Sequence, residues 1–369
     1  MSGARYSAGD FDYWVASGVD EPTVRDILAR VATGGQIRIS FQHERDAFAG
    51  AFGAVSQDFI LARNRRSGHF VGVCERVVRE SFVNGEIRRL PYLAGLRVVP
   101  GFRHRMLVLR GGFEAVRQLL SEPRDLPFAL TSIMSDNAPA LRLLGANLRG
   151  MPRYEPAGEL STFALAAQGH GEADLASDTD LPRIAELLQA QAREQQFAGV
   201  WTLDTLRAAI AAGWLQPRDF LVLRSADGIR ACAALWDQSA QRQIVVAGYA
   251  NWLSRTRPLI NLAARLTGLP RLPAPGGKLR SAYLSHVAVD EAAPEDLLAL
   301  VAAARAEARR RGIELLLMGL ASAHPLTPWL RKLRRQRELQ SRLFLVRWPE
   351  DALPSLDPEL RVAPELALL

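Results

Sequence analysis

Two spacings of apolar residues alternate along this chain, one typical of strands and the other typical of helices. Strands are predicted where apolar residues alternate with polar ones or run together briefly, and in the first half these are residues 12–17, 36–41, 57–63, 69–82, 92–99, 127–134 and 159–167. Helices are predicted where apolar residues recur three and four positions apart, at residues 21–31, 44–55 and 106–120. This order predicts an α/β (α+β) protein whose helices flank a mixed, mostly antiparallel sheet.

The same succession of patterns returns in the second half. Strands are predicted at residues 219–224, 229–236, 243–249, 283–290, 313–320 and 343–348, and helices at 180–195, 201–212, 295–311 and 325–333. The sequence YLSHVAVD at Tyr283–Asp290 also aligns with YLAGLRVV at Tyr92–Val99. Self-similarity of this kind indicates two copies of one topology. We therefore expect two tandem domains, residues 1–168 and 169–369.

The second domain contains an insertion at residues 251–277, with a predicted helix at 257–266 and the proline-rich sequence LPRLPAPGG. Long loops in compact domains are often functional, so this insertion fits a lid or part of an acceptor site. It fits equally well an element that covers a sheet edge. Beyond Pro349 prolines interrupt the chain, and we expect this tail to wrap along the surface.

A strand, a basic turn and a helix follow one another at residues 92–120. Pro100 and Gly101 end the strand, and Arg103, His104 and Arg105 come directly before the apolar spacing of the helix. The first amides of a helix lack intrahelical partners, and the helix dipole makes them attractive to anions. Arginine adds charge and forked hydrogen bonds. This order predicts a phosphate-binding site.

This stretch resembles the acyl-CoA-binding core of the GNAT superfamily of N-acyltransferases. The family has a strand of the form Leu-x-Val-x-Pro followed by Arg/Gln-x-x-Gly-x-Gly/Ala and a long helix; Leu96, Val98, Pro100 and Arg103 fit this pattern. Met106 and Val108 stand where the family has two small residues. The loop is therefore either reshaped around its basic residues or no longer holds the usual donor.

A second family feature lies downstream, where Asn137, Ala140 and Leu143 match the pattern Asn-x-x-Ala-x-x-Leu. Asn137 is also a good helix N-cap on physical grounds. Leu144 stands where the family often has a tyrosine that acts as an acid. The resemblance implies that acyl-CoA would be held by Leu96, Arg97, Val98, Arg103, His104, Arg105, Met106, Leu107, Val108, Asn137 and Ala140.

Tyr92, Glu86 and Tyr154 are the main candidates for the proton transfers of acyl transfer, and Glu75 and Glu80 on the strand before Glu86 are further ones. Tyr92 lies on the strand where the family often carries a carboxylate base; an ordinary packing role for this tyrosine is at least as plausible. Glu86 lies on the preceding stretch, and Tyr154 could replace the acid that is missing at Leu144. In the second copy, Asp290 and its acidic neighbours would repel a diphosphate, so we expect no ordinary acyl-CoA site there.

Composition excludes several other classes. The formal net charge is +7 and is spread evenly along the chain, so nucleic acid is not expected as a partner, except for a tRNA donor. Cys74 and Cys232 lie far apart in apolar stretches, which indicates buried thiols in a reducing cytoplasm. The chain has no zinc-ligand spacing and no apolar run of about 18 residues. We expect a cytoplasmic protein without a metal or a membrane span.

Two functions remain open from the sequence. The first is an N-acyltransferase that moves an acetyl or other acyl group from acyl-CoA to a small-molecule or peptide amine, and the retained motifs favour it. The second is a GNAT-like protein without acetyl-CoA activity: a binding or scaffold protein, or a transferase with another donor such as aminoacyl-tRNA. The missing small residues and tyrosine favour the second. A homodimer remains open in both cases.

Overall fold

A computed structural model describes residues 5–31, 36–43, 47–48, 51–267, 271–353 and 355–369. Thirteen strands among these residues form one sheet in the order β1-β2-β4-β5-β6-β7-β16-β8-β15-β14-β12-β11-β9. The first half of the chain contributes β1 (Arg5–Ala8), β2 (Phe11–Val15), β4 (Ala54–Asn64), β5 (Phe70–Val83), β6 (Glu86–Val98), β7 (Ala129–Met134) and β8 (Arg153–Ala166). The second half contributes β9 (Asp174–Leu175), β11 (Phe220–Ser225), β12 (Gly228–Trp236), β14 (Ser281–Ala288), β15 (Leu315–Ala321) and β16 (Gln336–Arg347).

Two short sheets join distant parts of the chain. In one, β3 (Ile37–His43) pairs with β13 (Arg242–Tyr249), and in the other β10 (Gln195–Gln196) pairs with β17 (Arg361–Val362). The α-helices are α1 (Glu21–Arg30), α2 (Met106–Leu120), α3 (Ala138–Leu144), α4 (Leu181–Arg193), α5 (Leu203–Ala211), α6 (Asn251–Thr267), α7 (Pro294–Arg310) and α8 (Thr327–Arg331). Most neighbouring strands of the main sheet run antiparallel, which confirms the predicted mixed, mostly antiparallel α/β architecture.

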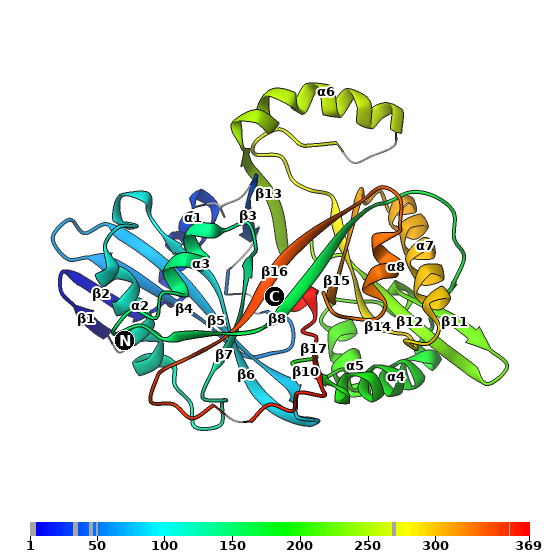
Figure 1. Cartoon of the computed structure of the whole chain (residues 1–369), viewed down its shortest axis with the longest axis horizontal. Coiled ribbons are helices and arrows are strands. Elements are labelled where there is room, and N and C mark those ends of the chain that lie inside the picture. The colour runs from blue at the N-terminus through cyan, green and yellow to red at the C-terminus, as the bar shows by residue number, and fades with distance from the viewer. Residues whose placement is uncertain (1–4, 32–35, 44–46, 49–50, 268–270, 354) are drawn as a thin grey trace.

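The two halves exchange their last long strands at the centre of the sheet. β16, from the end of the second half, lies between β7 and β8, and β8 in turn pairs with β15. Figure 1 shows β8 and β16 as two long neighbouring strands that cross the middle of the molecule. The boundary expected at residue 168 falls just after β8, and the sheet runs across it without a break.

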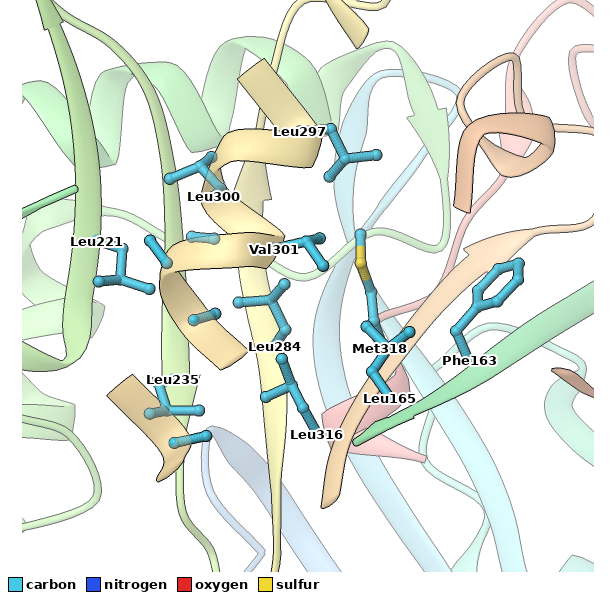
Figure 2. Packing of buried hydrophobic residues seen from close by; sticks show 14 of the residues in the cluster. Phe163, Leu165, Leu221, Leu235, Leu284, Leu297, Leu300, Val301, Leu316 and Met318 are labelled. Atoms are coloured by element: carbon cyan, nitrogen blue, oxygen red, sulfur yellow. The ribbon is translucent and has the colours of Figure 1, made fainter. Parts of the chain in front are cut away.

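Apolar packing holds the exchanged strand β8 against the second half. Phe163 and Leu165 of β8 are fully buried in the same cluster as Leu297 and Leu300 of α7 and Met318 of β15. Figure 2 shows these side chains between α7 and the strands beneath it. Truncating a buried phenylalanine typically costs about 3–5 kcal/mol, so Phe163 alone contributes substantially to the union of the halves.

Two turn and cap predictions agree with the structure. Asn84 and Gly85 both have positive φ angles, +52° and +76°, as a tight hairpin between β5 and β6 requires. The Asn137 side chain caps α3 by accepting a hydrogen bond from the amide of Ala140 at 3.4 Å. The turn and the cap depend only on residues close together in sequence, which is why the sequence predicts them.

Two predictions are wrong, for the segment 44–55 and for the C-terminal tail, because contacts with distant residues determine the structure there. The predicted helix at 44–55 partly lies outside the described residues, and the described remainder forms turns before β4 begins at Ala54. The tail does not simply wrap along the surface, because Ala367 is buried and Leu366 and Leu369 pack against core clusters. Figure 1 places the C-terminus in the middle of the molecule.

Candidate functional site

Strands β6 and β7 separate soon after they meet. Their parallel ladder consists of one pair, Tyr92 with Leu130. A bulge lies on β6 just beyond this pair, where Glu75 of β5 faces Ala94 but Val73 faces Arg97. A bulge leaves its extra residues outside the regular ladder. On the β7 side, the carbonyl of Leu93 accepts from the Thr131 hydroxyl at 2.8 Å, and β6 has no further ladder pair with β7 beyond Tyr92 among the described residues.

Positive charge gathers where β6 ends and α2 begins. Arg97 is half-buried, and among the described residues its Nε atom has no hydrogen-bond partner. Burial lowers the pKa of Arg97, the nearby cation of Arg103 lowers it further, and Glu75 acts in the opposite direction. The Nε atom of Arg103 donates to the carbonyl of Val98 at 3.1 Å, which holds this guanidinium at the strand end.

The first amides of α2 belong to the same place. α2 begins at Met106, directly after the exposed residues Arg103, His104 and Arg105. First-turn amides precede the first intrahelical hydrogen bond and carry the positive end of the dipole. Two neighbouring arginines and a helix N-terminus are groups that commonly bind an anion such as a phosphate.

Met106 and Val108, which stand where the family has small residues, both pack against apolar clusters and do not project from the loop into solvent. Val108 is 3% exposed and packs beneath α2 in a cluster that contains Tyr13. Met106 is half-buried and packs against the cluster that also contacts Val98. By contrast, the side chain of Leu107 is half exposed. The side chains of Met106 and Val108 therefore occupy much of their volume beneath α2 and not in the loop.

A small apolar cavity of about 30 Å³ lies between α2 and the sheet. It is lined by Tyr13, Ile60, Ala62, Gly72, Val73, Cys74, Leu96, Arg97, Val98, Val108, Leu109, Gly112 and Phe113. Gly72 is required here, because a Cβ atom at this position would lie 2.9 Å from the carbonyl oxygen of Arg97. Of the basic residues at the end of β6, the cavity therefore adjoins Arg97.

Tyr92 lies on the opposite face of the sheet from this cavity. Its hydroxyl is hydrogen-bonded to the Ser132 hydroxyl at 2.7 Å. Burial raises the pKa of Tyr92, while Ser132, Arg242 and Arg79 act in the opposite direction. The phenol is consequently neutral at physiological pH and can donate a proton or a hydrogen bond.

Glu75 and Arg79 share this face with Tyr92. Tyr92 pairs with Val77 of β5, and Glu75 and Arg79 lie two positions to either side of Val77, so alternation directs them to the same face. An Oε1 atom of Glu75 accepts from the Gln57 amide at 2.6 Å. Our sequence prediction included neither Arg79, Ser132 nor Arg242. Period-two alternation along β5 was the signal that could have found Arg79.

The structure places the other two candidate catalytic residues elsewhere. Glu86 is exposed at the hairpin end of β6, 3.7 Å from Arg88. Six residues separate it from Tyr92, which is roughly 20 Å along an extended strand. Tyr154 is buried with Leu144 and Phe113 on the α2 side of the sheet, and burial raises its pKa. The three residues therefore do not form one catalytic group.

Tyr154 also lines an open cavity of about 680 Å³ beyond the end of α3. The lining comes from the segment 147–156 and from Pro349. Asn137 and Ala140 lie at the other end of α3, where they form its N-terminal cap. This cavity includes none of the residues predicted to hold acyl-CoA.

The corresponding turn of the second half is filled by its own side chains. Glu291 forms an ion pair with Arg361 at 2.5 Å, and its carboxylate lies 3.2 Å from Nε2 of His324, whose pKa is lowered by burial. The carboxylate of Asp290 accepts from the amide of Ala292 at 2.8 Å. Acidic groups that already have partners leave no cationic site for a phosphate at this turn.

Two further observations concern the described residues as a whole. No group of three or more histidine, cysteine, aspartate or glutamate side chains among them is arranged to hold a metal ion. No helix within the described ranges is long and apolar enough to cross a membrane.

No family model matches the sequence, and no curated protein matches it. Solved structures do match the fold. The crystal structure of Saccharomyces cerevisiae N-myristoyltransferase with bound myristoyl-CoA superposes with a TM-score of 0.59 at 11% identity, covering 98% of this chain and 91% of that chain. A second structure of that enzyme with bound myristoyl-CoA gives 0.58 at 12% identity, covering 97% and 83%.

A GCN5-related N-acetyltransferase from Anabaena variabilis gives a TM-score of 0.44 at 14% identity, covering 91% of this chain and 72% of that chain. At such low sequence identities the similarity establishes the fold only, and any inference about the reaction has to come from the residues of the site. The match to N-myristoyltransferase, itself a GNAT-fold enzyme, runs over almost the whole of both chains. The chain therefore has the fold of the GNAT superfamily, as its sequence motifs predicted.

Proposed function

We propose that this protein is an N-acyltransferase that transfers an acyl group from acyl-CoA to an amine. The observation that supports the donor is the proximity of two cations, Arg97 and Arg103, where β6 ends and α2 begins at Met106. A half-buried guanidinium whose Nε has no partner among the described residues is costly unless an anion completes its hydrogen bonds. A CoA pyrophosphate at this turn would supply that anion.

The proposed reaction takes place where β6 and β7 separate. The amine nitrogen attacks the thioester carbonyl carbon, the carbon–sulfur bond breaks, and the thiolate leaves. Amides of the β6 bulge near Gly95 would polarise the carbonyl oxygen as it gains charge. Tyr92 is placed to protonate the leaving thiolate, and Glu75 to accept the proton of the amine through water.

Acyl-chain length is the finer part of the proposal. The cavity beneath α2 measures about 30 Å³, close to the volume that one water molecule occupies in the liquid. An acetyl group, with three heavy atoms, is larger than one water molecule, so even this short group would require neighbouring side chains to shift. A longer chain, such as the myristoyl group bound by the yeast enzyme, would have to displace side chains such as Val108 or Phe113.

Calorimetric titration with acetyl-CoA, myristoyl-CoA and desulfo-CoA tests the donor site. We expect binding to the wild type and a loss of about 100-fold in the double variant Arg97→Gln with Arg103→Gln, because two charged hydrogen-bonding groups are removed. Arg88→Gln is the matched control, since Arg88 is exposed at the hairpin end of β6.

Two outcomes would contradict the proposal. Absence of binding at millimolar CoA thioester would direct the search to another donor, such as aminoacyl-tRNA, or to a binding role. Equal binding by wild type and double variant would place the donor elsewhere. Where binding is found, a screen of small-molecule and peptide amines with detection of the free CoA thiol identifies the acceptor.

A further inference from the structure

One long segment of the chain carries basic residues without a single acidic one. Between Asp237 and Asp290 the sequence contains no aspartate or glutamate. The same segment contains Arg242, Arg255, Arg257, Arg265, Arg271, Lys278 and Arg280, so its formal charge of +7 equals that of the whole chain. The charge that looks evenly spread when the halves are compared is thus locally concentrated around α6.

α6 is attached to the rest of the protein by one apolar stripe. Leu253 and Ala264 are 4% and 3% exposed, and Ile260 is half-buried. Leu253 and Ile260 pack in one cluster with Val246 and Tyr249 of β13. At about 100° per residue, positions 253, 260 and 264 fall within about 40° of one another. Through this buried stripe, α6 covers one face of the β13–β3 pair.

A second apolar stripe of α6 faces solvent. Trp252, Leu259, Leu262 and Leu266 are 55%, 70%, 56% and 85% exposed. At about 100° per residue they fall within about 80° of one another, and the centre of this stripe lies about 140° from the buried one. Leu259 and Leu266 are among the most exposed large apolar residues of the described chain. Solvent-facing apolar residues aligned in this way mark an interaction surface.

Basic side chains accompany the exposed stripe. Arg255 is exposed, and its position falls within the arc of the stripe itself. Arg271, Lys278 and Arg280, on the loop that returns from α6, are also exposed. That loop is held to the helix by hydrogen bonds between Asn261 and Leu272 at 2.7 and 3.0 Å. In Figure 1 α6 projects beyond the sheet, away from both groups of covering helices.

We propose that α6 and its return loop bind the surface of an anionic lipid bilayer. An interfacial helix combines a leucine- and tryptophan-containing face with arginine and lysine residues, and lies in the plane of the membrane. Anionic lipids supply the complementary charge. A symmetric contact between two copies through this face would instead bring like charges together, among them Arg255 and Arg271 of each copy. The proposal does not depend on acyl transfer.

Co-sedimentation of the whole protein with vesicles tests this surface. We compare phosphatidylcholine vesicles with vesicles that also contain phosphatidylglycerol, at low and at high salt. The wild type is expected to bind the anionic vesicles and to dissociate at high salt, because screening weakens the attraction. Leu259→Gln with Leu262→Gln and Leu266→Gln should reduce binding by about tenfold or more. Val19→Gln, at an 89% exposed valine in the first half, is the matched control.

A charge variant keeps the proposal falsifiable if the leucine variant folds poorly. Arg255→Gln with Arg271→Gln leaves the apolar stripe intact and should weaken binding roughly fivefold for each arginine. Two results would overturn the proposal. One is equal sedimentation with neutral and anionic vesicles, or with neither. The other is a wild-type dimer, seen by sedimentation equilibrium, that the leucine variant dissociates, since the stripe would then join two copies.

Discussion

Gly95 of β6 and His286 of β14 adopt the same unusual backbone conformation in two strands of one sheet, with φ angles of +59° and +50°. Each lies at a register shift with a neighbouring antiparallel strand: between Ala94 and Arg97 in β6, which pairs with β5, and between Ser285 and Ala288 in β14, which pairs with β12. The alignment of Tyr92 with Tyr283 places these bulges at equivalent positions. Only the first has a glycine, and only the first adjoins a basic turn.

Replacing Gly95 tests whether its left-handed conformation is required. A Cβ atom there would make ordinary contacts of 3.5–3.6 Å with Glu75 and Leu28, so the cost comes from the backbone. We expect Gly95→Ala to lower the free energy of unfolding by about 1–2 kcal/mol, measured by urea denaturation. Gly101→Ala is the control, because Gly101 has open space around it and no positive φ. Equal effects of the two changes would contradict this explanation.

Two adjacent glycines of α2 should respond in opposite directions. A Cβ atom on Gly111 would lie 2.4 Å from the Tyr13 hydroxyl, which donates to the carbonyls of Leu107 and Val108. We expect Gly111→Ala to cost about 2 kcal/mol or more through overpacking. Gly112→Ala meets only a Tyr13 ring carbon at 4.0 Å and should stabilise the helix by about 0.5–1 kcal/mol. Thermal unfolding of both variants measures the difference.

Removing the Tyr92 hydroxyl tests the proposed acid. With an acyl acceptor in hand, we expect Tyr92→Phe to lower kcat about 100-fold while the affinity for acyl-CoA stays unchanged. Ser132→Ala keeps the phenol and removes its hydrogen-bond partner, so it should lower kcat much less. Because burial raises the pKa of Tyr92, the wild-type rate should show no titration of this group near neutral pH. Equal losses in both variants would indicate a positioning role.

A buried carboxyl group makes stability depend on pH. Burial raises the pKa of Glu365 to about 7, while amide donation from His286 and Ala367 acts in the opposite direction. The folded state thus holds this proton more tightly than the unfolded state, whose glutamate titrates near pH 4.3. Stability from this group is fully present below that pH and is lost as the pH rises through about 7.

Glu365→Gln should remove this dependence. The variant's free energy of unfolding, relative to wild type, should rise by about 3–4 kcal/mol between acidic and mildly alkaline solution. His286, whose pKa burial lowers to about 3, titrates in the opposite sense in both proteins. It therefore cancels when variant and wild type are compared by urea denaturation at each pH. A difference that does not change with pH would show that Glu365 keeps its ordinary pKa.

Local chemistry explains what could be predicted about the donor site. The strand ending at Pro100, the cations Arg103 and Arg105 and the helix that begins at Met106 are contiguous in sequence, so their order alone indicates an anion site. The turn at Asn84–Gly85 is equally local. Glu86, by contrast, lies about 20 Å of extended strand from Tyr92, a separation that depends on where the hairpin turns.

The sequence by itself determined the class of fold, the repeated order of elements and the basic turn, because apolar periodicity and turn chemistry act over a few residues. Only the tertiary structure decided that β16 enters between β7 and β8, and that Glu75 of β5 lies two positions from the residue that pairs with Tyr92 of β6. It also decided that α6 presents a second apolar stripe to solvent. These features depend on pairings between residues far apart in the chain, whose geometry no local pattern contains.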